Sequence, residues 1–277
     1  MSLASFRQAL LLVLFGFLTS GAFAQSLSDQ IAQTVSDQIQ IAPPMRQVAP
    51  PSPDASAIEL ERQADDLRSR KQYLDAIDYY QAALTKAPQS ATLHNKLGIT
   101  ELMLQRFKDA GKEFERSIKL DKTLADSVNN LGVIDYERRK YGAAVKQYKK
   151  AITLRPDSAS FYSNLGAAYF ARKDFERATQ AYAKAVQLDP EIFERTSHTG
   201  ITAQMASPED RAHYDYVVAK LYAKMGDRDR SLEFLRKSME EGYKDVKNAY
   251  TDPEFADLRK DARFDELMKS KPIVIPE

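Results

Sequence analysis

The chain has 277 residues, of which 43% are hydrophobic and 29% are charged, and it contains no cysteine. This length and apolar content suffice for one or two soluble domains with a buried core. Lysine and arginine number 40 against 39 acidic residues, and a formal charge of +1 argues against a protein that coats nucleic acid. The absence of cysteine excludes disulfides, thiol nucleophiles and thiolate metal sites, and three histidines offer little for a histidine site. We therefore expect no metal site and no cofactor.

Residues 1–24 have the three-part pattern of a secretory signal. Arg7 precedes an apolar run at 9–18, and the small residues Ala22 and Ala24 precede Gln25. The run is shorter than the roughly 20 apolar residues that span a membrane. We expect a bacterial-type signal peptide cleaved after Ala24, whose insertion is the chain's transient and only membrane contact. Loss of Arg7 with the signal lowers the formal charge to 0, and the mature chain is expected in the periplasm or cell envelope.

Residues 25–56 are predicted to be a linker rich in proline, serine and glutamine. Five of the 12 prolines fall here, at 43, 44, 50, 51 and 53, and proline at this density favours extended chain. Before them, apolar residues recur every fourth position in 26–41. That spacing could form a short amphipathic helix, which we interpret as a transiently helical tether because isolated helices of this length are marginal.

A 34-residue period dominates the rest of the chain. Leu-Gly pairs recur at 97–98, 131–132 and 165–166. Three further positions recur with the same period, and we call each such set of equivalent positions a column. They carry an alanine (Ala76, Ala110, Ala144 and Ala178), an aromatic residue (Tyr80, Phe114, Tyr148 and Tyr182) and a small residue (Ala83, Ser117, Ala151 and Ala185). Such a period is typical of repeat proteins in which each unit buries its apolar face against the next.

One unit, 125–158, shows what the pattern predicts. Its first half places Val128 and Leu131 on one helical face, and its second half places Ala144 and Tyr148 on another, at helical spacings. Pro156 cannot lie inside a helix and marks the exit to the next unit. Each unit is therefore predicted to be a helix–turn–helix hairpin.

These columns resemble the tetratricopeptide repeat. The resemblance covers four units, at 57–90, 91–124, 125–158 and 159–192, and a degenerate fifth unit at 212–245. It implies an all-α fold, a right-handed superhelical array of helical hairpins. Glu101 and Asp135 depart from the pattern, since they stand where the family usually has tyrosine.

Two segments outside the period complete the chain. Residues 193–211 hold turn formers and no sustained apolar period, which predicts an inserted loop, with 209–211 starting the first helix of the fifth unit. Residues 246–277 are predicted to form capping helices and a tail, with one helix beginning at Asp252-Pro253. Phe255, Leu258 and Phe264 are expected to be buried there, because an end repeat must cover its open apolar face.

The sequence contains no motif for catalysis. Neither phosphate-binding glycine loop occurs, and there is no GxSxG elbow and no HExxH helix. We therefore expect no catalytic residue and interpret the chain as a non-enzymatic binding protein.

The resemblance implies that the first helix of each unit lines a concave groove. Asparagine amides both donate and accept hydrogen bonds, so they could clamp the backbone of an extended peptide, with apolar residues forming pockets between them. The peptide-binding candidates are Asn95, Lys96, Asn129, Asn130, Val133, Tyr136, Asn164, Ala167 and Phe170. The competing interpretation is that these asparagines serve only the repeat's own structure.

Our functional hypothesis is a scaffold or adaptor at the cell envelope that binds a protein or peptide segment in this groove, and not nucleic acid. The alternative is a structural assembly component that self-associates through the ends of the array or through residues 26–41.

Overall fold

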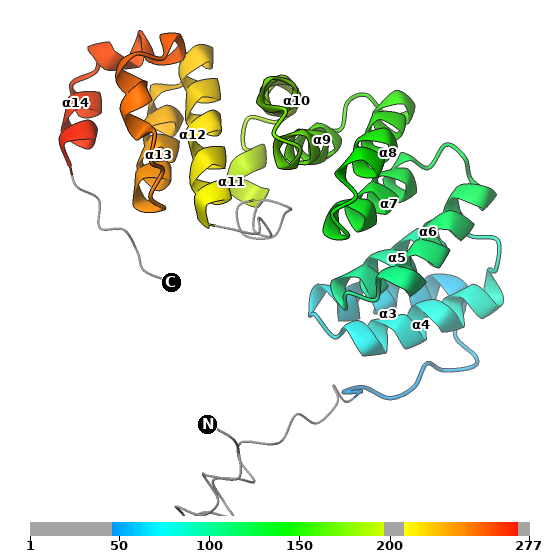
Figure 1. Ribbon diagram of the computed structural model, residues 1–277. Helices are drawn as coiled ribbons and strands as arrows, with labels where there is room; N and C mark the ends of the chain where they lie inside the picture. Colours follow the sequence, from blue (N-terminus) through cyan, green and yellow to red (C-terminus); the bar gives the residue numbers. More distant parts are fainter. Residues whose placement is uncertain (1–45, 197–207, 271–277) are drawn as a thin grey trace, which may run out of the picture. The chain divides into compact units, whose positions relative to one another are not determined.

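The computed structural model describes residues 46–196 and 208–270 (Figure 1). Contacts divide the chain into Met1–Arg46 and Gln47–Glu277, and the description below concerns the second unit. The predicted signal peptide and the 26–41 segment lie outside the described residues. In the described ranges the regular elements are helices, without a strand, and none of these helices is both long and apolar enough to cross a membrane.

Four helix pairs follow one another from residue 57. Their first helices are α3 (Ala57–Ser69), α5 (Ala91–Met103), α7 (Ala125–Glu137) and α9 (Ala159–Ala171). Their second helices are α4 (Tyr73–Lys86), α6 (Phe107–Leu120), α8 (Tyr141–Leu154) and α10 (Phe175–Leu188). Each first helix packs on its own second helix, which packs in turn on the next first helix from α4 through α9. The predicted all-α array of helical hairpins is confirmed.

The two helices of a pair approach closely because a glycine faces an aromatic ring. A Cβ atom added to Gly98 would lie 2.6 Å from the Phe114 ring, and one added to Gly166 would lie 2.4 Å from the Tyr182 ring. Both rings are almost completely buried. The glycine and aromatic columns of the sequence are therefore the two sides of one contact.

The turn within each pair contains a residue in the left-handed conformation. These residues are Lys71, Gln105, Arg139 and Lys173, with φ of 63°, 56°, 58° and 64°, and Gly226 (φ 81°) holds the equivalent position of the fifth unit. A residue with a side chain is strained at positive φ, so each of the first four hairpins carries a similar unfavourable contribution to its folding free energy.

The last part of the predicted linker is bound along α4. Asp75, almost fully buried, accepts hydrogen bonds from the backbone N–H of Gln47 (3.0 Å) and of Val48 (3.3 Å). The Tyr79 hydroxyl donates to the carbonyl of Ala49 at 3.2 Å, and Lys86 Nζ donates to the carbonyl of Pro53 at 2.6 Å. Residues 47–53, which we name the strap, are thus held by their backbone within the segment predicted to be a linker.

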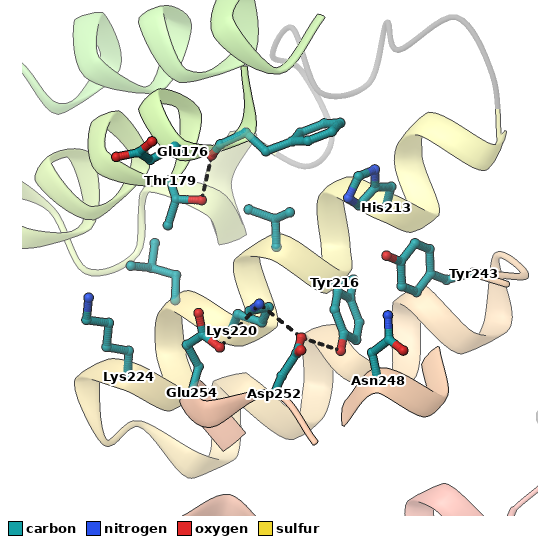
Figure 2. Close-up of a pocket in the computed structure, with 13 residues that line it drawn as sticks. Glu176, Thr179, His213, Tyr216, Lys220, Lys224, Tyr243, Asn248, Asp252 and Glu254 are labelled. Atoms are coloured by element: carbon teal, nitrogen blue, oxygen red, sulfur yellow. Dashed lines mark hydrogen bonds and ion pairs between the residues drawn. The ribbon is translucent and has the colours of Figure 1, made fainter. Parts of the chain in front are cut away.

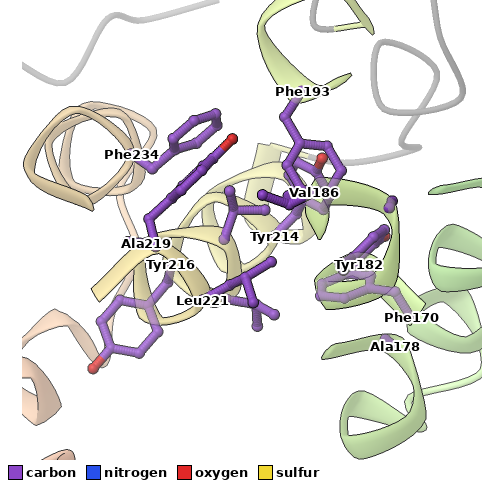
Figure 3. Packing of buried hydrophobic residues seen from close by; sticks show 14 of the residues in the cluster. Phe170, Ala178, Tyr182, Val186, Phe193, Tyr214, Tyr216, Ala219, Leu221 and Phe234 are labelled. Carbon is purple, nitrogen blue, oxygen red and sulfur yellow. The ribbon is translucent and has the colours of Figure 1, made fainter. Parts of the chain in front are cut away.

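The region predicted as an inserted loop contains helical residues at both ends. Helix α11 (Ile192–Thr196) occupies its start, and α12 (Pro208–Met225) begins one residue before the expected 209–211. Phe193 of α11 is buried against the Tyr182 and Tyr214 rings, with ring centroids 5.3 and 6.0 Å away (Figure 3). The local sequence has no apolar period that would predict a helix, and α11 is instead stabilised by packing on the neighbouring helices. The rest of the predicted loop, 197–207, lies outside the described residues.

The C-terminal region packs on the fifth helix pair, α12 and α13 (Arg228–Glu240). It consists of three short 3₁₀ turns, η2 (Val246–Tyr250), η3 (Pro253–Phe255) and η4 (Leu258–Lys260), followed by α14 (Ala262–Lys269). Phe255, Leu258 and Phe264 are buried as expected. The helix expected from Asp252-Pro253 is instead the single turn η3, and residues 271–277 lie outside the described residues.

Candidate peptide-binding face

The first helices are joined by side-chain hydrogen bonds that span 35 residues each. Asn130 Nδ2 donates to Asn95 Oδ1 at 3.1 Å, joining α7 to α5. Asn164 Nδ2 donates to Asn129 Oδ1 at 3.0 Å, joining α9 to α7. In both bonds the fifth residue of one repeat accepts and the sixth residue of the next repeat donates. We name these four residues the asparagine ladder.

The ladder also has a bond within one helix and a buried extension. Asn129 Nδ2 donates to Asn130 Oδ1 at 3.2 Å, so the two inter-repeat bonds form one network. Ser127 donates its hydroxyl to Asn95 Oδ1 at 3.0 Å, and its oxygen lies 2.7 Å from that of Ser117. Buried polar groups need such partners, because an unsatisfied one costs about 1–3 kcal/mol.

Between the first two repeats, ion pairs take the place of the asparagine bonds. Lys96 Nζ on α5 donates to Glu61 Oε1 and to Asp65 Oδ2 on α3, both at 2.6 Å. Burial by itself would lower the pKa of Lys96, but the hydrogen bonds to both carboxylates outweigh it and raise that pKa. Burial would raise the pKa of Asp65, but the bonds from Lys96 and Tyr80 hold it below its usual value. Lys96 and Asp65 are therefore both charged at neutral pH.

The predicted binding residues on this face differ in how far solvent reaches them. Asn95 and Asn129 are 8% and 7% exposed, whereas Lys96, Asn130, Asn164 and Val133 are half-buried. The half-buried group is what another molecule can contact. The structure thus brings the predicted polar candidates together along one face, with their deeper members serving the array itself.

The apolar candidates are mostly part of the core. Tyr136, Ala167 and Phe170 are 8%, 3% and 4% exposed. The Tyr136 ring lies 5.2 Å from that of Tyr141, and the Phe170 ring lies 5.2 Å from that of Phe175. Of the predicted apolar residues, Val133 keeps the most accessible side chain, so the structure does not arrange the other three around an open pocket.

Sequence reasoning missed a cavity beside α12, whose lining includes His213, Tyr216 and Lys220 (Figure 2). Their positions in the fifth unit are equivalent to those of Thr92, Asn95 and Ile99 in the second unit. Extending the groove columns into the degenerate fifth unit would have found them. Across the described ranges no group of three or more histidine, aspartate or glutamate side chains is placed to hold a metal ion.

Comparison with known proteins agrees with the helix pairs. Sequence models of the family match three segments, a TPR repeat at 132–172 and tetratricopeptide repeats at 159–192 and 61–125. No curated protein sequence matches the chain.

Solved structures with the same arrangement of helices include PilF of Pseudomonas aeruginosa, with 19% identity, a TM-score of 0.52, and coverage of 73% of this chain and 87% of that one. A thermophilic TPR protein of Thermus thermophilus is 20% identical, with a TM-score of 0.48 and coverage of 76% and 98%. At 19% identity the likeness to PilF concerns the fold alone. Together with the helix pairs, the sequence matches identify residues 61–125 and 132–192 as tetratricopeptide repeats.

Proposed function

We propose that this protein is a non-enzymatic scaffold that holds a protein or peptide segment across the face formed by α5, α7 and α9. The observation that carries the proposal is the asparagine ladder, which fixes side-chain amides on three successive first helices. A row of fixed amides suits an extended peptide, whose backbone offers donors and acceptors along its length.

The half-buried members of the ladder retain bonding capacity. Each amide nitrogen carries two hydrogens, and the inter-repeat bond uses one of those on Asn130 and one of those on Asn164. Because the first bond already holds each side chain in place, a bound segment would not have to order it. Such preorganisation lowers the entropic cost of association.

The location we propose is the periplasm or cell envelope. The pattern of residues 1–24 supports it, since an apolar run and small residues precede Gln25. N-terminal sequencing of the protein purified from its native cells tests this part. A mature chain that begins at Gln25 supports export, and a chain that retains residues 1–24 contradicts it.

Site-specific photo-crosslinking in cells tests the binding face. A photoreactive residue replaces Asn164 on α9, and the control replaces Lys149, an exposed residue on α8. We expect a discrete adduct at position 164 and none at 149, with the partner identified by mass spectrometry.

The other outcomes are equally informative. Scattered adducts of equal yield at both positions would contradict the proposal. Adducts of the chain with itself at 164 would favour self-assembly, and a stable multimer in size-exclusion chromatography with light scattering would then agree with them.

A further inference from the structure

A cavity of about 390 Å³ lies between α10, α12 and the segment that follows α13 (Figure 2). This volume is within the range of about 300–1,000 Å³ that is usual for ligand sites. Its α12 wall is the first helix of the fifth unit, so the cavity lies on the face that the ladder occupies in the earlier repeats. The C-terminal segment contributes Tyr243, Asn248, Asp252 and Glu254 to its lining.

Aromatic rings form one side of the cavity. The His213 ring lies 4.5 Å from the Phe175 ring and is stacked on the Tyr243 ring at 5.3 Å. The Tyr216 and Tyr243 rings lie 4.6 Å apart. Burial, followed by the charge of Lys173, lowers the pKa of His213, so its ring is neutral at pH 7. The faces of tyrosine and phenylalanine rings attract a cation.

Charged groups form the other side. Lys220 Nζ lies 2.9 Å from Asp252 Oδ2 and 3.2 Å from Glu254 Oε2, and the Tyr216 hydroxyl donates to Asp252 Oδ2 at 2.9 Å. The two carboxylates and one ammonium group leave this triad with a net charge of −1. Glu254 Oε2 is buried, and Lys220 Nζ at 3.2 Å is its ion-pair partner. At the edge, the charges of Glu176 and Lys224 cancel.

We propose that this cavity binds the ammonium or guanidinium group of a lysine or arginine side chain in the segment held by the array. A basic side chain would neutralise the triad, offer a donor to Glu254, and lie against the rings of Tyr216 and Tyr243. An acidic side chain would add to the negative charge. An aliphatic side chain would leave the net negative charge of the triad uncompensated, and a buried charge without a counter-charge is costly. The inference rests on the proposed function, because it assigns a residue type to the partner.

The test uses the full chain with tyrosine rings labelled for NMR and four probes, N-acetyl amides of arginine, lysine, norleucine and glutamate. We expect the arginine and lysine probes to shift the Tyr216 and Tyr243 signals in a saturable manner. The norleucine and glutamate probes should bind at least about tenfold more weakly, because they lack the cation that complements the triad.

Glu254→Gln removes one charge from the triad and keeps its shape, so it should weaken arginine binding at least about fivefold. Glu233→Gln is the matched control, since Glu233 is an exposed glutamate that also pairs with a lysine, Lys237, at 2.7 Å. It should change arginine binding less than about twofold, as expected for an exposed pair.

Three results would each overturn the inference: no saturable shift with arginine or lysine, norleucine binding as tight as arginine binding, or unchanged arginine binding in Glu254→Gln. The probes do not need the ladder, so Asn164→Ala should bind arginine normally. Failure of the crosslinking experiment together with normal arginine binding would therefore reject the proposed function and not the cavity's preference.

Discussion

Asn164 donates its side-chain amide to Asn129 Oδ1 at 3.0 Å, and this bond joins the first helices of two successive repeats. Asn129 is buried and also donates to Asn130, whereas Asn164 is half-buried. The same pair therefore links the interior of the array to the face on which we place the partner. Its two members should respond differently to substitution.

Asn129→Ala should destabilise the protein by about 1–2 kcal/mol, because it removes an acceptor and a donor from a buried network. Asn164→Ala should cost less than about 1 kcal/mol, since water can reach its position and replace the lost bond, but it should weaken partner binding. Urea denaturation measures the first effect. Equal losses of stability in the two variants would contradict the assignment of separate roles.

Gly166→Ala should destabilise the fourth repeat by about 1–3 kcal/mol, because the new Cβ would overpack against the buried Tyr182 ring. Gly142→Ala is the matched control on α8, where a Cβ would have nothing within 4 Å. It should stabilise the protein by up to about 1 kcal/mol through helix propensity. Thermal unfolding followed by circular dichroism distinguishes the two, and a stabilising Gly166→Ala would refute the close contact.

Asp215 should make the protein less stable as the pH rises from about 4 to about 8. Burial, followed by the nearby charge of Glu241, raises the pKa of Asp215 to about 8, while Lys237 and Arg211 partly oppose the shift and Glu233 adds to it. The folded state therefore keeps a proton that the unfolded state releases near its usual pKa of 3.8. Above about pH 8 the folded protein holds a buried carboxylate.

Asp215→Asn should accordingly raise the free energy of unfolding by a few kcal/mol more at pH 9 than at pH 5, because between pH 5 and about pH 8 the unfolded carboxyl is ionised while the folded one keeps its proton. Urea denaturation of both proteins at the two pH values checks this. A variant with the same stability difference at pH 5 and pH 9 would show that Asp215 is charged throughout.

Asp75→Ala should release the strap from α4, because Asp75 accepts the backbone N–H groups of Gln47 and Val48. Hydrogen exchange and proteolysis within 47–53 should increase, while the helices keep their protection. Asp109→Ala is the matched control, since Asp109 holds the same position in the next repeat and pairs with Lys112 at 2.9 Å. Unchanged exchange in the strap of Asp75→Ala would show that other contacts hold it.

The repeat architecture could be predicted because the period marks the same contacts several times. The Leu-Gly and aromatic columns are the residues that join the two helices of each pair, so their spacing carries structural information directly. The strap and α11 could not be predicted in this way. Each is held by residues distant in sequence, Asp75 in one case and Tyr214 in the other, and each occurs once.

The candidate face was predictable in part for a related reason. The columns placed Asn95, Asn129, Asn130 and Asn164 on the first helices, but they could not show that the asparagines bond to one another across a 35-residue step. Burial of Phe170 was also hidden, because it depends on rings of later elements, such as that of His213 at 5.2 Å. Hydrogen bonding and ring packing between repeat units depend on the tertiary structure, and the equivalent positions in the sequence do not reveal them.

The left-handed turn residues have a consequence for engineering this chain. Lys71, Gln105, Arg139 and Lys173 share nearly one backbone geometry although their side chains differ, so the turn is specified by its place in the unit. A 34-residue module could therefore be excised or duplicated between equivalent turns without a newly designed junction. Glycine at such a position, as the fifth unit already has at Gly226, would relieve the local strain in each added module.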